Sequence, residues 1–237
     1  MERKFEFSIG EFYHVFNRGN DKRSIFENPN DYSRFLALLY LCNGSKPVNI
    51  RDQFPKGLPF GKFDELEKVD KGEELVAVGA YCLMPNHFHL LLKETAENSI
   101  TKFMGKVSTA YSMYYNKRYG RTGGLFEGTF QARHTESDEY LKYLFSYIHL
   151  NPLKFLYPEW RERGVEDTER ARDFLNRYGY SSYADYAGKK RPERIVLTQN
   201  AFPEYFNESG EFEDFITEWI QFSSVPEENL LGREQYA

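Results

Sequence analysis

Two apolar segments separated by a short turn constrain the fold of this 237-residue chain more than any other feature. ELVAVGAYCLM at 74–84 is largely apolar, as a buried β-strand is, and HFHLLLKE at 87–94 has the same character. Only Pro85 and Asn86 separate the two segments, and both residue types favour turns. The pattern therefore predicts a β-hairpin.

The elements predicted around this hairpin complete an α+β pattern. Alternating or helically spaced apolar residues define each element, and turn and capping residues mark its ends. In chain order they are a strand at 11–18, a helix from about Asp31 to Asn43, the two hairpin strands, a helix at about 100–119, a short strand within 125–134, and a helix from Thr135 or Ser137 to about Leu150. This order predicts a small antiparallel sheet with helices packed on one face.

The length of the chain suits one hydrophobic core with an appendage. We predict a main domain at 1–160 and a C-terminal extension of short helices and loops at 161–237. Within the main domain, residues 44–72 carry Gly, Pro and Lys without clear periodicity. That composition predicts a long surface loop or insertion, the kind of segment in which function or mobility is often found.

Composition excludes several classes of protein. The two cysteines, Cys42 and Cys82, cannot build a disulfide framework or a cysteine zinc site. No segment approaches the roughly 18 apolar residues that a membrane helix needs, and the N-terminal MERKFEFSIG has no apolar run typical of a signal peptide. We therefore expect a cytoplasmic protein without membrane partners.

Charge is distributed unevenly along the chain. The total is −5, but residues 201–237 hold nine acidic side chains against Arg233 alone, which is −8 and leaves +3 for residues 1–200. Residues 101–135 carry six basic side chains and one acidic one, Glu127. This basic stretch is either a solvated helix face or a local phosphate-binding surface. The acidic segment predicts a surface helix that stays clear of an anionic ligand or one that is autoinhibitory.

Two histidines in the second hairpin strand are candidate metal ligands. Because side chains alternate along a strand, His87 and His89 share one face while Phe88 and Leu90 point to the other. Two imidazoles on one face can chelate a cation, although histidines in strands are more often satisfied by hydrogen bonds alone. The apolar opposite face favours a special role, since two polar groups side by side need water, hydrogen bonds or a metal.

A tyrosine and an asparagine share a stripe of the last predicted helix. Tyr147 and Asn151 are four residues apart, so they lie on the same helix face. An aromatic core stripe would explain Tyr147, but a carboxamide in that stripe needs partners. Its oxygen can complete a mixed set of nitrogen and oxygen ligands with His87 and His89. Such a set, with positions left open, suits Mn²⁺ or Mg²⁺ better than structural zinc.

These residues occur in motifs that resemble those of the single-tyrosine HUH transposases. The motifs are AYCLMPNHFHLLL with its His–hydrophobe–His core, YIHLNP with the tyrosine and the amide, YHVFNRGNDKRSIF, YNKRYGRTGGLFEGTFQARH, and YSSYADYAG at 180–188. The last is similar to a motif of transposases associated with repetitive extragenic palindromes (REP) and of related chromosomal homologues. The resemblance covers roughly residues 8–190, and the order and spacing of the motifs agree.

The resemblance implies a ferredoxin- or RRM-like sheet and a defined chemistry. His87, His89 and Asn151 would hold the divalent metal, and Tyr147 would cleave single-stranded DNA at hairpin-bearing sites through a 5′-phosphotyrosine. Compact members of the family act as homodimers and longer REP-type members as monomers, so both states stay open for this chain. Basic side chains that would bind DNA phosphates are Arg18, Lys22, Arg23, Lys102, Lys106, Arg118, Arg121 and Arg133.

Two other functions fit parts of the pattern. A domesticated, catalytically silent hairpin-binding protein would bind DNA without cleaving it. A histidine-dependent RNA endonuclease or ligase would use His87 and His89 for acid–base chemistry and would work in the presence of a chelator. Competing nucleophiles, all without an amide four residues later, are Tyr111, Tyr114 and Tyr115.

Overall fold

A four-stranded antiparallel sheet forms the centre of the computed structural model, which describes residues 6–54, 63–205 and 210–221. The strands are β1 (Phe12–Arg18), β2 (Val76–Met84), β3 (His87–Glu94) and β4 (Gln131–His134), and their order is β2-β3-β1-β4. Helix α1 (Pro29–Leu41) connects β1 to β2, and α3 (Ser99–Tyr119) connects β3 to β4. This βαββαβ arrangement is ferredoxin-like and confirms the predicted fold class.

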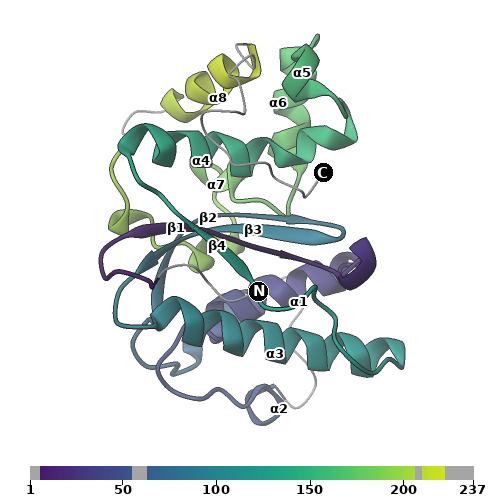
Figure 1. Ribbon diagram of the computed structural model, residues 1–237, viewed down its shortest axis with the longest axis vertical. Helices are drawn as coiled ribbons and strands as arrows, with labels where there is room; N and C mark the ends of the chain where they lie inside the picture. The colour runs from purple at the N-terminus through teal and green to yellow at the C-terminus, as the bar shows by residue number, and fades with distance from the viewer. Residues whose placement is uncertain (1–5, 55–62, 206–209, 222–237) are drawn as a thin grey trace.

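Helices α1 and α3 cover one face of the sheet, as expected (Figure 1). Alternate residues of the central strands, such as Val15 and Leu90, are fully buried in this layer. Asn28, rather than Asp31, accepts the capping hydrogen bond at the start of α1. Asp31 is buried one turn into the helix and accepts a hydrogen bond from Tyr114 Oη at 2.8 Å.

The opposite face is also covered, which corrects the expectation that helices pack on one face only. Helix α4 (Asp138–Leu150), capped by Ser137, lies across this face, and α8 (Glu211–Gln221), α5 (Trp160–Arg163) and α6 (Thr168–Arg177) of the C-terminal extension lie on its far side (Figure 1). Every residue of β2 is buried, and Ala80 and Cys82 pack against the α4 layer. Because β2 is apolar on both sides, the sheet needs a covering layer on both sides.

The extension contacts both α4 and the free edge of β2. Its described helices are α5 (Trp160–Arg163), α6 (Thr168–Arg177), α7 (Tyr183–Tyr186), η4 (Pro192–Val196), η5 (Gln199–Ala201) and α8 (Glu211–Gln221). Leu83 N donates to Tyr180 O at 2.9 Å and Ser182 N donates to Tyr81 O at 3.0 Å. The YSSY segment therefore acts as a short additional strand that protects the edge of the sheet.

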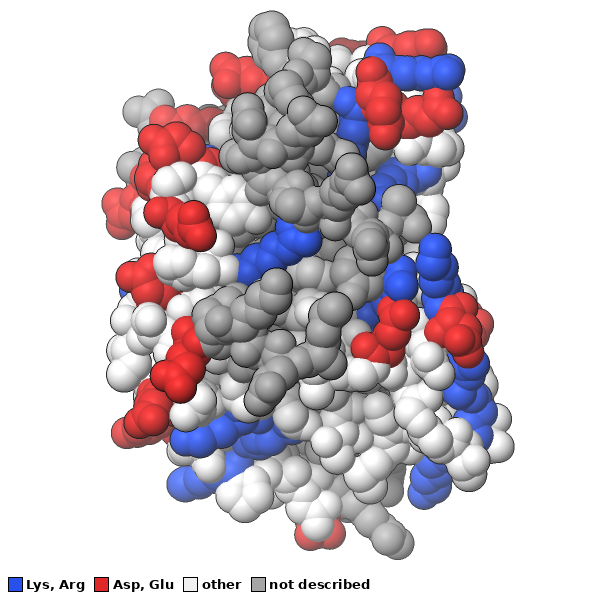
Figure 2. Space-filling view, viewed as in Figure 1, with Lys and Arg blue, Asp and Glu red and all other residues white. Residues whose placement is uncertain are grey.

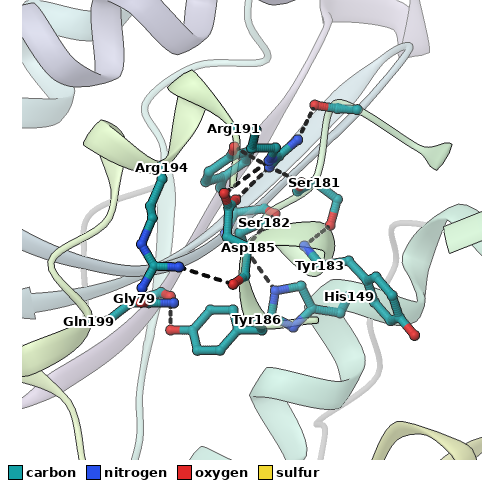
Figure 3. A network of polar contacts seen from close by, with 12 residues as sticks. Gly79, His149, Ser181, Ser182, Tyr183, Asp185, Tyr186, Arg191, Arg194 and Gln199 are labelled. Atoms are coloured by element: carbon teal, nitrogen blue, oxygen red, sulfur yellow. Dashed lines mark hydrogen bonds and ion pairs between the residues drawn. The ribbon is translucent and has the colours of Figure 1, made fainter. Parts of the chain in front are cut away.

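A buried polar network fastens this segment to the sheet (Figure 3). The Asp185 carboxylate accepts hydrogen bonds from Arg191 Nε at 3.0 Å and from Nη2 at 2.6 Å. Arg191 also donates to the Tyr81 hydroxyl at 2.7 Å. His149 of α4 is linked to the Ser182 hydroxyl at 2.7 Å. The YSSYADYAG motif thus has a structural role, because it joins β2 and α4.

Replacing Gly79 with Ala is expected to destabilise the protein by about 1–3 kcal/mol, the usual cost of overpacking. Gly79 lies at the register shift in β2, and a methyl group there would be 2.5 Å from the Phe202 ring. Phe202 is buried against Phe12 and Phe145, so its ring has little room to move. Urea unfolding of both proteins measures the difference, and equal midpoints would show that the ring adapts freely. Gly105→Ala on α3 is the matched control, because its added methyl group meets nothing within 4 Å.

The segment at 44–72, predicted to be a long surface loop or insertion, lies between α1 and β2 and includes regular structure in its described part. It contains α2 (Ile50–Gln53) and η2 (Phe63–Lys68), and Phe63 and Leu66 are buried in the core beside α1. Spacing of these apolar residues was too irregular to indicate a helix. Residues 55–62 lie outside the described structure, as do residues 206–209 and 222–237 of the predicted acidic segment. Among the described helices, none is long and apolar enough to cross a membrane.

Candidate functional site

His87 and His89 lie on the face of β3 that is turned toward α4. Their ring centroids are 5.0 Å apart, and the strand register places Arg18 opposite His87 and Phe16 opposite His89. The two histidines therefore share a face, as strand alternation requires. Met84, the last residue of β2, pairs with His87 next to the turn of the hairpin.

Both histidines are neutral imidazoles with a lone pair available at neutral pH. Burial, together with the smaller effect of the positive charges of Lys154, Arg18 and Arg161, lowers the pKa of His87 to about 3. Burial also holds the pKa of His89 well below its usual range, with smaller contributions from neighbouring histidines and cations. Neutral imidazole is the form that binds metals. The same cations give this region positive charge that can attract a phosphate.

Helix α4 brings Tyr147 against His89 from the other side of the layer. The Tyr147 ring lies 5.4 Å from the His89 ring, edge to face, and only 3% of the residue is exposed. Leu144 and Ile148 of the same helix pack into the layer between α4 and the sheet and fix the helix in this position. Tyr143 lies one turn earlier on the same stripe, with its ring centroid 5.8 Å from that of Tyr147. The residues of this stripe are therefore part of the hydrophobic core and also part of the candidate site.

Asn151 lies one turn after Tyr147, where α4 passes into η3 (Asn151–Phe155). Its side-chain Nδ2 donates to Tyr147 O at 2.9 Å, which links the two candidate residues. Its Oδ1 is buried and has no hydrogen-bond partner within the described structure. A buried acceptor of this kind is costly unless a ligand or water uses it. The oxygen thus suits a metal that the two imidazoles also bind.

Three further residues of the site were missed in the sequence. His14 Nε2 is 2.9 Å from His89 Nδ1, and the Arg161 guanidinium lies 4.7 Å from the centre of the Tyr147 ring. Lys154 is close enough to lower the pKa of both His87 and His89. The only sequence signal for His14 is its place in a strand. Lys154 and Arg161 have none, because they lie in the short helices η3 and α5, after the periodic pattern of α4 has ended.

The predicted DNA-binding cations divide into groups. Arg18, paired with Glu127, and Arg133, opposite His14, belong to strands next to the histidines. Lys22 and Arg23 follow β1, in a segment that includes η1 (Asn20–Lys22). This segment lies beside the C-terminal half of α3, because the Tyr115 hydroxyl donates to Ser24 O. Two further predicted cations, Arg118 and Arg121, lie at the C-terminal end of α3. The other two, Lys102 and Lys106, lie near its start.

The start of α3 is remote from the candidate site. Sixteen residues separate Lys102 from Arg118, which is about 24 Å of helix at 1.5 Å per residue. Lys106 donates instead to the carbonyl oxygens of Gly44 and Lys46. In Figure 2 acidic side chains predominate along the left side, whereas basic ones are more frequent on the right, where Figure 1 shows the β2–β3 turn and the end of α3.

The competing tyrosines lie on the wrong side of the sheet. Tyr111 and Tyr115 of α3 are buried in the layer that contains α1, opposite the face that carries His87 and His89. Burial raises the pKa of Tyr111, and its hydroxyl donates to Ile25 O. Tyr114 donates to the buried Asp31. A structural role explains all three.

Comparison with known proteins finds a family model that matches part of the chain. Residues 66–151 match the model of the family described as IS200-like transposases. This span contains His87, His89, Tyr147 and Asn151, whereas His14 and Arg161 lie outside it.

A solved structure shows a more distant likeness. It is described as a REP-associated tyrosine transposase bound to a REP hairpin. The likeness covers 88% of this chain and 93% of the other, with 9% sequence identity and a TM-score of 0.44. No curated protein matched significantly.

Proposed function

We propose that this protein is a metal-dependent transposase that nicks and rejoins single-stranded DNA, with Tyr147 as the nucleophile. One observation carries the proposal: the Tyr147 ring lies against His89, and the same turn of chain presents the unpaired Oδ1 of buried Asn151. The phenol and the amide oxygen come from one end of α4, and the two neutral imidazoles come from the face of β3 that is turned toward this helix. The match of residues 66–151 to the model of the IS200-like transposases supports the assignment.

His87, His89 and Asn151 are the residues that would hold a Mg²⁺ or Mn²⁺ ion. No group of three or more His, Cys, Asp or Glu side chains with metal-binding geometry occurs in the part of the chain that the structure describes. A site here therefore needs the amide oxygen as its third protein ligand. Two nitrogen donors and one neutral oxygen donor fit a cation that keeps open positions. Such an ion supplies Lewis acidity and orients the scissile phosphate.

The reaction proposed for Tyr147 conserves the energy of the phosphodiester bond. The phenol loses its proton and its Oη forms a bond to phosphorus. The bond from phosphorus to the 3′ oxygen breaks, and that oxygen takes up a proton to become a 3′ hydroxyl. The phosphate stays on the tyrosine as a 5′-phosphotyrosine. Attack by another 3′ hydroxyl reverses these steps and joins two strands.

Cations around Tyr147 would position the substrate. The Arg161 guanidinium over the Tyr147 ring provides positive charge where a phenolate forms, and Lys154 and Arg18 add charge beside His87. Charge of this sign also contacts the non-bridging phosphate oxygens, where negative charge is concentrated. The sequence motifs imply a DNA hairpin as the substrate.

A nicking assay tests this function against the two alternatives. End-labelled single-stranded hairpins and matched duplexes are incubated with the protein in Mn²⁺, in Mg²⁺ and in EDTA. The proposal predicts nicks in hairpin DNA that require metal. Binding without nicking in any metal would favour the silent hairpin-binding protein, and cleavage of RNA in EDTA would favour the histidine-dependent nuclease.

Replacing Arg161 with Gln is expected to lower the nicking rate about 10²-fold, the usual effect of removing one group that stabilises the transition state. The change removes the positive charge beside the Tyr147 ring and keeps a polar side chain of similar length. Single-turnover nicking measures the effect. Lys102→Gln near the start of α3 is the matched loss of a remote charge and is expected to nick at the parental rate. Equal rates for the two variants would contradict a role for Arg161.

A further inference from the structure

His14 is a buried histidine that the proposed reaction does not use. It lies in the middle of β1, is 0% exposed, and has its Nε2 atom 2.9 Å from His89 Nδ1. The two rings are nearly parallel, 25° apart, with centroids separated by 5.1 Å. The Tyr147 ring meets the His14 ring edge-on at 5.6 Å. His14 is therefore in contact with both a candidate metal ligand and the candidate nucleophile.

A hydrogen bond between two neutral imidazoles contains one proton, so it has two possible directions. If His14 donates, the proton of His89 is on Nε2, and no lone pair remains on that atom. If His89 donates from Nδ1, its Nε2 keeps a lone pair that can bind a metal. Metal-binding histidines generally donate the other ring N–H to a fixed acceptor, which sets their tautomer and orientation.

We propose that His14 is a positioning residue whose Nε2 accepts the Nδ1–H of His89 and thereby leaves the His89 Nε2 lone pair for the metal. The inference rests on the proposed function, because it assigns His89 as a ligand. Within the described structure, His14 makes the hydrogen bond of the His89 ring. The strand register supports a fixed geometry, since Phe16, two residues after His14, pairs directly with His89.

Because the proposed acceptor, His14, is neutral, it adds no negative charge to the site. A carboxylate in place of His14 would add negative charge next to the metal ligand, whereas an imidazole adds none. Arg133 is opposite His14 on β4, and Lys154 and Arg161 lie near His89. The site thus keeps its positive character, which favours the approach of a phosphodiester.

The tautomer can be measured without metal, DNA or activity. The chain has five histidines, so protein labelled with ¹⁵N-histidine gives a small set of ring signals that single substitutions assign. The expected result is a His89 ring protonated on Nδ1. His14→Phe is expected to shift the signal toward protonation on Nε2, and His14→Gln, whose amide oxygen can accept, to restore Nδ1–H. His134→Phe is the matched control, since His134 is a strand histidine that contacts Glu11 at 2.9 Å.

Mn²⁺ affinity, followed by electron paramagnetic resonance without DNA, gives the second measurement. His14→Phe is expected to bind Mn²⁺ roughly 10–100-fold more weakly, as loss of a ligand's outer partner generally does. His14→Gln and His134→Phe are expected to bind more nearly as the parent does, and thermal unfolding checks that each variant is folded. A His89 ring protonated on Nε2 in the parent, or unchanged Mn²⁺ affinity in His14→Phe, would overturn the inference. Nδ1 protonation in a parent that binds no Mn²⁺ would support the hydrogen-bond direction and overturn the metal-binding function.

Discussion

Tyr147→Phe is expected to abolish nicking and joining while leaving DNA binding unchanged. The substitution removes only the phenolic oxygen, which is the proposed nucleophile, and keeps the ring that packs against His89 and beneath Arg161. Removal of a nucleophile from a comparable catalytic unit lowers the rate by roughly 10⁶-fold. Single-turnover nicking of a labelled hairpin measures the loss, and a gel-shift titration with the same DNA measures binding.

Tyr143→Phe is the matched control for this experiment. Tyr143 precedes Tyr147 by one turn on the same stripe and also loses only a hydroxyl. It is expected to nick at close to the parental rate. Full activity in Tyr147→Phe together with loss of activity in Tyr143→Phe would show that Tyr143, and not Tyr147, is the nucleophile.

The second large effect concerns stability. Asp185→Ala is expected to reduce the free energy of unfolding by about 3–5 kcal/mol, because it leaves a buried positive charge without its partner. The Asp185 side chain is 0% exposed and that of Arg191 is 13% exposed, and two hydrogen bonds join them (Figure 3). Arg191 also donates to Tyr81 and to Gly179 O, so it cannot easily turn toward solvent. Urea unfolding monitored by circular dichroism measures the change.

An exposed ion pair gives the control for Asp185→Ala. Asp173 and Arg177 are 3.2 Å apart on α6, with side chains 70% and 79% exposed. Asp173→Ala is expected to change stability by less than about 1 kcal/mol, as is usual for exposed pairs. Similar losses in the two variants would mean that the Asp185 network does not fasten the extension to the sheet.

Local patterns were sufficient to predict most elements of the sheet. The strand predicted at 87–94 is β3 (His87–Glu94), and the helix expected after Thr135 or Ser137 begins with Ser137 as its cap. These features depend on neighbours in the sequence: alternation places His87 and His89 on one face, and helical spacing aligns Tyr147 with Asn151. The part of the site that could be predicted is the part that local periodicity determines.

The remainder depends on contacts between distant segments. His14 meets His89 across 75 residues because β1 lies beside β3, and no local pattern specifies that neighbour. Arg161 reaches Tyr147 only after the chain has turned back along α4. The second covering layer was missed for a similar reason, since continuous apolar character in β2 indicates burial without indicating which helix covers it.

The proposal that Tyr147 is the nucleophile is tested most directly by identifying the residue to which the DNA becomes linked. Protein that has reacted with a hairpin in Mn²⁺ is denatured, treated with nuclease and trypsin, and analysed by mass spectrometry. Trypsin releases the peptide YLFSYIHLNPLK between Lys142 and Phe155, and fragmentation distinguishes its two tyrosines, Tyr143 and Tyr147. The account predicts a nucleotide linked through its 5′ phosphate to Tyr147, absent in EDTA. A nucleotide on any other residue, or nicked DNA with no protein adduct, would contradict it.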